Sequence, residues 1–245
     1  MSTPTDDRFL GGHVIVRQLP NGFRAGLDAV MLAAAVPARN GDETLELGAG
    51  AGTASLCLAA RIPEVSIVGV EIEEALVSLA NDNARANGME RRLRFVPGDV
   101  FKLPKELRRD FAHVFCNPPF HDARGEASPD PGRDTALRDR GKLGEWMELG
   151  LRRTISGGTF TAIIRADRLG EAMTRLPERG VATLPLWPRH GQPAKRVILQ
   201  VRKGSGARPA LLPGLTLHNA DGTYTAEADS ILREGASLAL DSSRL

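Results

Sequence analysis

Short apolar segments alternate with longer amphipathic segments through the central part of the chain. The short segments are rich in Val, Ile, Leu and Phe, which is typical of buried strands. The segments between them repeat their apolar residues every three or four positions, as one face of a helix does. This pattern predicts strands at 44–47, 66–71, 93–96, 112–116 and 158–164, and helices at 53–61, 73–87, 142–154 and 167–179.

Signals at the ends of these elements support the pattern. Gly88 follows the helix at 73–87 as its C′ residue, and Asp167 is a candidate N-cap. Two further strands, at 182–187 and 196–202, are joined by a segment too short for a helical crossover, so we expect them to pair antiparallel. The alternation predicts an α/β fold with a Rossmann-like parallel sheet, helices on both faces and an antiparallel hairpin near the C-terminus.

The two ends of the chain depart from this alternation. Side chains at 13–16 alternate between apolar and polar, and Asn21-Gly22 is a turn signal, so we expect a short hairpin there. An Ala-rich segment predicts a helix at 27–36, and a second short helix is expected near 226–233. We divide the chain into a hairpin and lid helix at 1–40, the α/β domain at 41–203, and an extension that packs on the same domain at 204–245.

The composition adds few constraints. With 245 residues, 42% of them hydrophobic, the chain can bury one sizeable core, and its net charge of +2 only weakly supports a nucleic-acid partner. It has two cysteines, no signal-peptide pattern, and no apolar run near the roughly 20 residues that cross a bilayer. We therefore expect a cytoplasmic protein with no membrane partner. No metal is expected, because metal-ligand spacing is missing among His13, His113, His121, His190 and His218.

A glycine-rich turn is expected where the first strand of the α/β domain meets its helix. Glycines in such a turn let the backbone approach a ligand closely, and the helix that follows offers free N–H groups to a carboxylate or phosphate. Taken alone, the glycines are also compatible with a tight turn that binds nothing. The candidate cofactor-binding residues of this turn are Glu46, Gly48, Ala49, Gly50 and Gly52.

Two acidic residues follow the next two strands. Glu71, with Ile72 beside it, is placed to accept both hydroxyls of a ribose, and Asp99 is placed to accept an adenine amino group while the Val100 N–H faces a ring nitrogen. Alone, Glu71 is also explained as a helix N-terminal acid and Asp99 as a turn residue. Together with the glycine turn, they follow the carboxyl ends of parallel strands, where ligands bind in such sheets.

Glu46 distinguishes between two adenosine cofactors. NAD is the rival ligand, since it uses the same glycines and the same ribose acid. Glu46 lies inside an apolar strand, however, and an unpaired carboxylate there is costly to bury. A ligand ammonium would offset that cost. S-adenosylmethionine carries an ammonium group and NAD does not, so we predict S-adenosylmethionine as the cofactor.

The fourth strand runs into an Asn-Pro-Pro-Phe motif. Two prolines stiffen the segment and remove two backbone donors, so it presents carbonyl acceptors beside the side-chain oxygen of Asn117. Two acceptors that converge on one amino group can hold both of its protons and turn its lone pair toward a methyl donor. Phe120 adds a flat surface on which a base can stack. The alternative is a rigid turn, but the upstream motif favours a catalytic role for Asn117, Pro118, Pro119 and Phe120. Asn117 is also a candidate cofactor-binding residue, because it follows a strand at the same sheet edge as the glycine turn.

Charged residues outside these motifs are candidates for contact with the substrate. Asp28 is either an ordinary N-cap of the helix at 27–36 or, with Arg24, part of a segment that covers the cofactor. Basic residues cluster after Phe120 and near the final hairpin, where they are either solvated or line a phosphate-binding cleft. The substrate-binding candidates are Arg24, Asp28, Arg133, Arg138, Arg140, Arg189, Lys195 and Arg196.

The chain resembles a known family along most of its length. The segments FRAGLDAVMLAAAV, LELGAGAGTASL, VGVEIEEALVSLANDNARANG, NPPF, AKRVILQVRKG and HNADGTYTAE are similar to those of bacterial adenine-N6 methyltransferases that modify valine tRNA beside the anticodon. The resemblance implies a seven-stranded class I methyltransferase sheet with its methyltransferase domain at 41–203. It also implies cofactor binding by the glycine turn, Glu71 and Asp99, a base held by residues 117–120, and RNA, specifically tRNA, as the partner.

Related activities remain as alternatives. The NPPF motif is shared with guanine-N2 methyltransferases of rRNA and, as NPPY, with glutamine-N5 methyltransferases of release factors. The latter carry a separate helical N-terminal domain, and the roughly 40 residues before Gly41 are too few for one. A noncatalytic RNA-binding module has no need of two converging acceptors. The sequence leaves open the exact nucleotide, the orientation of the RNA and the oligomeric state.

Overall fold

A parallel sheet forms the centre of the computed structural model, which describes residues 4–20, 24–119 and 143–240. Its strands come in the order β10-β8-β9-β7-β6-β3-β4-β5, and β11 also pairs with β8. Five of these strands run parallel to one another, as the alternating pattern predicted. They are β3 (Glu43–Leu47), β4 (Ser66–Glu71), β5 (Leu93–Pro97), β6 (Phe111–Cys116) and β7 (Thr154–Arg165).

The last long strands form the expected antiparallel hairpin. β8 (Val181–Arg189) pairs with β9 (Arg196–Arg202), and β9 pairs with β7, both antiparallel. The expectation of seven strands was wrong for the described residues, where the sheet has nine. The two extra strands, β10 (Ala210–Leu211) and β11 (Leu215–His218), come from the C-terminal extension and pair parallel with β8. They cover unpaired backbone groups that an edge strand would otherwise expose.

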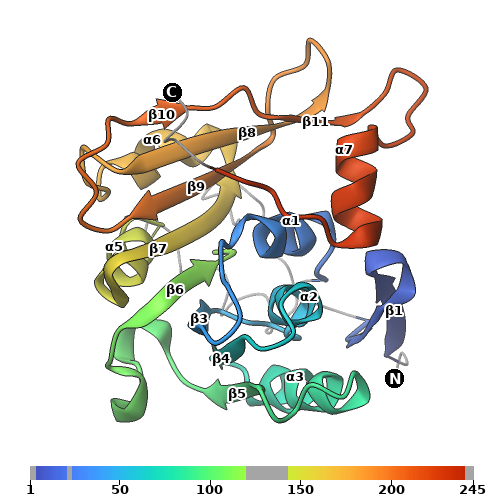
Figure 1. The fold of residues 1–245 in the computed structure, drawn as a ribbon. Helices are drawn as coiled ribbons and strands as arrows, with labels where there is room; N and C mark the ends of the chain where they lie inside the picture. The colour runs from blue at the N-terminus through green and yellow to red at the C-terminus, as the bar shows by residue number, and fades with distance from the viewer. Residues whose placement is uncertain (1–3, 21–23, 120–142, 241–245) are drawn as a thin grey trace, which may run out of the picture.

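Helices cover both faces of the sheet, and each face has its own buried apolar cluster (Figure 1). One face carries α1 (Leu27–Ala35), α2 (Thr53–Arg61) and α3 (Glu74–Ala86), and the other carries α5 (Leu143–Arg152) and the short α6 (Leu169–Met173). Between β5 and β6 the chain forms two 3₁₀ turns, Val100–Lys102 and Lys105–Leu107. No helix in the described ranges is long and apolar enough to cross a membrane.

The helix expected at 167–179 is shorter than predicted. A 3₁₀ turn, Ala166–Arg168, leads into α6, which ends at Met173. Pro177 accounts for the early end, because proline has no N–H for Met173 and disfavours helical dihedrals in the residue before it. The N-cap prediction for Asp167 was wrong, since its carboxylate accepts hydrogen bonds from the Arg165 guanidinium instead.

The N-terminal hairpin forms, but around a different turn. β1 (Thr5–Phe9) pairs antiparallel with β2 (Val14–Gln18), and the chain reverses at Leu10–Gly12. The turn signal at 21–22 is not the turn of this hairpin, and residues 21–23 lie outside the described part of the chain. Near the C-terminus, α7 (Ala226–Asp229) continues into a π-helical turn, Ser230–Glu234, that contacts the hairpin turn and α1.

Candidate cofactor and target site

The predicted cofactor motifs meet at one edge of the sheet. Because β3, β4, β5 and β6 are parallel, their carboxyl ends lie side by side. Leu47 pairs with Val70 and with Cys116, and Glu71 pairs with Pro97. The glycine turn, Glu71, Asp99 and Asn117 all follow directly from these strand ends, so the fold brings together residues that are up to 71 positions apart in the chain.

Two glycines of the turn are required for different reasons. Gly48 has a φ of +70°, and a Cβ on it would lie 2.9 Å from Cη2 of Trp146 on α5. Gly50 has a φ of +53°, and no described atom lies within 4 Å of where its Cβ would be. Gly48 therefore allows packing behind the turn, whereas Gly50 leaves backbone that a ligand can approach.

The start of α2 offers hydrogen-bond donors at the same place. Gly52 is its N-cap residue, with a φ of +83°, and no described side chain caps the helix. The Thr53 hydroxyl is buried and has no hydrogen-bond partner among the described residues. The first N–H groups of a helix lack partners within the helix, and its dipole favours negative charge there. The arrangement is suited to a carboxylate or phosphate.

Glu71 connects the glycine turn to the start of α3. Its Oε2 accepts from the Gly50 N–H at 2.8 Å, and its Oε1 accepts from the Ile72 N–H at 2.7 Å and the Glu73 N–H at 3.1 Å. These bonds use three of the roughly four acceptor positions of a carboxylate. Beside it, the Ile72 side chain is 54% exposed, which provides an apolar surface next to the carboxylate.

Glu46 is buried, as its place in an apolar strand indicated. Its side chain is 3% exposed, and the Ser55 hydroxyl donates a hydrogen bond to it. Burial raises the pKa of Glu46 to about 8, and the hydrogen bond from Ser55 opposes that rise. No signal in the sequence indicated Ser55, because its contact with Glu46 depends on how the first turn of α2 packs over β3.

Asp99 occupies a turn at the same edge. Its Oδ1 accepts from the Phe101 N–H at 2.9 Å and so caps the 3₁₀ turn that follows β5. The Val100 side chain is buried in the apolar cluster beneath. The turn interpretation of Asp99 therefore describes its local contact, and its role toward adenine stays a prediction.

Asn117 has a buried acceptor that nothing in the described residues satisfies. It follows Cys116, which pairs with Leu47 just before the glycine turn. Asn117 Oδ1 is buried and has no hydrogen-bond partner in the described ranges. Leaving a buried acceptor unpaired costs about 1–3 kcal/mol, so a ligand donor would stabilise this position. Pro118 and Pro119 continue the segment, and Phe120 lies outside the described residues.

Comparison of the chain with known proteins indicates its enzyme class. Residues 16–130 match the family model described as the methyltransferase small domain. A tRNA1(Val) (adenine(37)-N6)-methyltransferase of Yersinia enterocolitica is 28% identical over 219 residues, 86% of this chain and 85% of that protein. A protein of the same name from Actinobacillus succinogenes is 27% identical over 217 residues, 86% of this chain and 89% of that protein. The chain is an S-adenosylmethionine-dependent methyltransferase. The resemblance drawn from its motifs is confirmed.

Solved structures show the same fold. A predicted O-methyltransferase from Agrobacterium tumefaciens has a TM-score of 0.72 and 24% identity, covering 86% of the methyltransferase and 98% of that chain. TrmN from Thermus thermophilus has a TM-score of 0.50 and 22% identity, covering 72% of the methyltransferase and 48% of that chain. These neighbours confirm the class I methyltransferase sheet, to which the methyltransferase adds two short strands.

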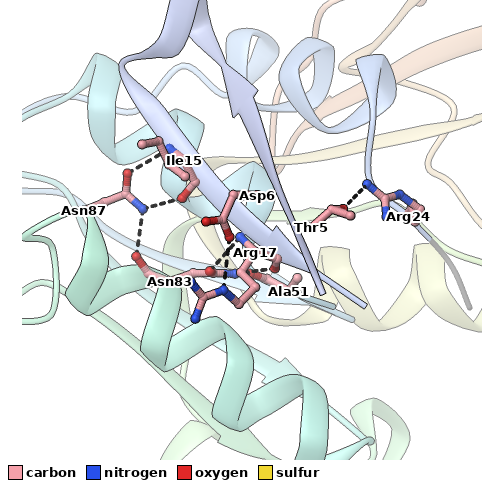
Figure 2. Close-up of polar contacts among 8 residues, drawn as sticks. All are labelled: Thr5, Asp6, Ile15, Arg17, Arg24, Ala51, Asn83 and Asn87. Carbon is pink, nitrogen blue, oxygen red and sulfur yellow. Dashed lines mark hydrogen bonds and ion pairs between the residues drawn. The ribbon is translucent and has the colours of Figure 1, made fainter. Parts of the chain in front are cut away.

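The N-terminal hairpin of the methyltransferase is docked by two asparagines, Asn83 on α3 and Asn87 at its C-cap (Figure 2). Asn83 accepts from the Arg17 N–H at 2.9 Å and donates to the carbonyls of Arg17 and Ala51, both at 3.0 Å. Asn87 accepts from the Ile15 N–H at 3.0 Å and donates to its carbonyl at 2.7 Å. The two amides thus satisfy alternate residues of the outer edge of β2. Asn83 also holds the glycine turn through Ala51, a contact that no signal in the sequence indicated.

The segment before α1 is held by this hairpin. Gln18 accepts from the Ala25 N–H at 2.7 Å and donates to its carbonyl at 3.1 Å. Arg24 donates to Asp7 and to the Thr5 hydroxyl. Asp28 is not an N-cap, because Gly26 takes that position. Its carboxylate instead accepts from Arg196 Nε at 2.8 Å, so the N-cap interpretation of Asp28 was wrong.

One of the two predicted basic groups lies at the same sheet edge. Arg196 pairs with Arg165, at the carboxyl end of β7, and with Leu186 near the end of β8. Arg189 and Lys195 flank this point. Arg133, Arg138 and Arg140 lie outside the described residues.

A cavity of about 570 Å³ lies at the opposite edge of the sheet, among the first residues of β3, β4, β5 and β6. It is separate from the motif residues.

Proposed function

We propose that this methyltransferase transfers a methyl group to the exocyclic N6 of adenine in tRNA. The observation that carries the proposal is the buried Asn117 Oδ1, an acceptor without a described partner, beside the glycine turn. The tRNA substrate is supported by relatives named tRNA1(Val) (adenine(37)-N6)-methyltransferases. A tRNA substrate is also consistent with a cytoplasmic enzyme.

The cofactor residues divide along the length of S-adenosylmethionine. The start of α2 and the Gly50 backbone suit its carboxylate, and buried Glu46 suits its ammonium. Glu71 has acceptor capacity left for a ribose hydroxyl, and exposed Ile72 offers an apolar surface to the adenine. Gly48, Ala49, Gly52, Asp99, Val100 and, from the target side, Asn117 complete the proposed cofactor-binding set.

Methylation of the exocyclic amine requires hydrogen-bond acceptors around that amine and no strong base. An exocyclic amine is a weak nucleophile because its lone pair is delocalised into the ring. Asn117 Oδ1 and the Pro118 carbonyl, as two acceptors, would hold its two protons and localise that lone pair. The cofactor supplies a methyl group on a cationic sulfur. Positioning the amine in line with that methyl group is worth on the order of 7–11 kcal/mol.

The remaining predicted residues and segments are assigned to substrate binding and to the frame of the site. A base in an RNA loop has no pairing partner, so it is accessible without being extracted from a duplex. Arg189, Lys195 and Arg196 rim the carboxyl edge, where RNA phosphates would approach.

We assign residues 1–40 to a hairpin and lid helix, 41–203 to the methyltransferase domain, and 204–245 to an extension of that domain.

A transfer assay tests this function. Labelled S-adenosylmethionine is incubated with the enzyme and with tRNA, rRNA or protein from cells that lack it. We expect label in tRNA, as N6-methyladenine on nucleoside analysis. Label in rRNA guanine would assign the guanine-N2 activity, and label confined to protein would assign the glutamine-N5 activity; either result would reject the proposal.

Asn117→Ala separates the chemical step from cofactor binding. Loss of one of the two acceptors should lower transfer by roughly 100-fold or more, comparable to removing one preorganised contact to a transition state. The dissociation constant for S-adenosylhomocysteine, measured by calorimetry, should stay within about threefold, because the other proposed cofactor contacts lie at or just after the ends of β3, β4 and β5. A large loss of cofactor affinity would show that the main role of Asn117 is to bind the cofactor.

A further inference from the structure

The C-terminal extension places two stacked rings at the edge of the sheet that carries the reaction. His218 ends β11 and pairs with Arg189 at the carboxyl end of β8. The rings of His218 and Tyr224 stack with centroids 4.8 Å apart and an interplanar angle of 28°. His218 Nδ1 is 3.1 Å from the Pro188 carbonyl, which fixes the imidazole. Tyr224, the chain's single tyrosine, is 36% exposed.

The loop that carries Tyr224 is held by its own hydrogen bonds. Asn219 Nδ2 donates to the Thr223 hydroxyl at 3.1 Å and to the Tyr224 carbonyl at 3.0 Å. Asp221 accepts from the N–H and hydroxyl of Thr223, and the hydroxyl bond holds the pKa of Asp221 below its usual range. Residues 219–224 are nevertheless all exposed. A solvent-facing loop with so many internal bonds contributes little to the core, and its rigidity lowers the entropy lost on binding a partner.

Positive charge accompanies the rings. Arg189, paired with His218 across the strands, lies at the same edge as Lys195 and Arg196. Asp221 lies near Arg189 and Asp28 pairs with Arg196, so these two acids offset part of this charge. An exposed ring beside guanidinium groups is the combination that binds single-stranded nucleic acid, through stacking on the bases and attraction of the phosphates.

We propose that His218 and Tyr224 form a stacking platform for a nucleotide of the RNA substrate other than the one that reacts. The inference rests on the proposed function. In the order β6-β7-β9-β8-β11, the platform is four strand spacings from β6, which leads to Asn117. At about 4.8 Å each, these give about 19 Å, well beyond the ~3.4 Å between stacked nucleotides. At this distance the platform does not contact the reacting base and takes no part in the chemistry. Its role is to bind a second nucleotide of the RNA.

Steady-state kinetics with an unmodified valine tRNA transcript test the platform. Tyr224→Leu keeps an apolar side chain over His218 but removes the flat ring, and Tyr224→Phe keeps the ring. We expect Tyr224→Leu to raise the KM for the transcript roughly 5- to 100-fold, as loss of one stacked base does, with kcat within about twofold. Tyr224→Phe should stay within about twofold in both constants. The affinity for S-adenosylhomocysteine should be unchanged in both variants.

A matched control comes from the same extension. Leu211 on β10 is 73% exposed but pairs with Thr183, near the opposite end of β8. Leu211→Ala should leave the KM for the transcript unchanged. An unchanged KM for the transcript in Tyr224→Leu would overturn the platform. A change only in the oligomeric state of the variant would also overturn it, because the rings would then serve contact between copies of the chain. If the wild-type enzyme methylates no RNA, the proposed function fails first, and the platform with it.

Discussion

Glu46 is the residue whose charge state depends most on what occupies the site. In the free protein, burial raises its pKa to about 8, so the carboxyl group is mostly protonated at pH 6. A ligand ammonium favours the carboxylate and lowers its pKa in the complex. Binding at pH 6 therefore releases close to one proton, whereas binding near pH 8 releases about half a proton on average.

We accordingly predict that the affinity for S-adenosylhomocysteine rises between pH 6 and pH 8, by at most about tenfold per pH unit. Calorimetry across this range measures it, and buffers of different ionisation enthalpy count the protons released. Glu46→Gln retains an acceptor for Ser55 but cannot ionise, so its binding should be weaker and independent of pH in this window. A flat profile for the wild-type protein would remove Glu46 from the ammonium role.

Residue-level chemistry was predictable where the reason is local to one side chain. A carboxylate in an apolar strand indicated a buried acid at Glu46, and the structure has one. Its partner Ser55 was not predictable, because nine residues and a strand-to-helix turn separate them. The same limit applies to Asp28, which is placed by sequence near a helix start but is paired with Arg196, 168 residues away.

Among the elements, α3 connects the N-terminal hairpin to the glycine turn. Asn83, on α3, and Asn87, its C-cap residue, are four residues apart, so they point to the same side and reach alternate residues of β2. They differ in one respect: Asn83, 2% exposed, also donates to the Ala51 carbonyl in the glycine turn, whereas the further bond of Asn87 goes to the Asn83 carbonyl.

This difference makes the two asparagines a matched pair for mutation. Asn83→Ala should raise the dissociation constant for S-adenosylhomocysteine roughly 3- to 10-fold, because one hydrogen bond that orders the glycine turn is lost. Asn87→Ala should lower the free energy of unfolding by about 0.5–1.5 kcal/mol, because its hydrogen bonds to Ile15 are exposed, and should leave cofactor affinity unchanged. Asn83→Ala, at a buried position, should lower it by about 1–3 kcal/mol. Equal effects of both variants on cofactor binding would contradict a specific link through Ala51.

Element boundaries followed from sequence where the pattern was strong and the ends carried local signals. α2 and β4 have the predicted bounds, because glycine and proline mark their ends. The exceptions have identifiable reasons: Pro177 shortened α6, and the hairpin turned at Gly11, not at Asn21-Gly22. At Gly11, with a φ of +66°, a Cβ would lie 2.9 Å from the Arg233 carbonyl, a contact from the far end of the chain.

At the scale of the whole molecule, the C-terminal extension contacts both the sheet and the N-terminus. β10 and β11 add to the edge of β8, and the helical turn that follows packs on the hairpin turn and α1. Leu10, Val30 and Ile231 belong to one buried cluster, although they come from the hairpin, α1 and the C-terminal turn. The extension therefore joins the beginning and the end of the methyltransferase fold.

Ile231→Ala should destabilise the whole protein through this cluster. Ile231 is 2% exposed, and its truncation leaves a cavity that costs about 2–5 kcal/mol of unfolding free energy. Urea denaturation measures this loss, with exposed Leu211→Ala as a control that should change stability by less than about 0.5 kcal/mol. A small effect of Ile231→Ala, or a separate early unfolding transition, would show that the extension is not part of the cooperative core.

The amino-acid sequence by itself determined the order of strands and helices, the antiparallel hairpin at β8 and β9, and the strand-end positions of the motif residues. These follow from local periodicity, from connection length and from the rule that parallel strands share a carboxyl edge. The tertiary structure alone decided the two added strands, the docking of β2 by Asn83 and Asn87, and the burial of Asn117 Oδ1 away from any partner in the described part of the chain. Each of these features depends on which groups that are distant in the sequence come into contact in the fold. No local pattern in the sequence specifies those contacts.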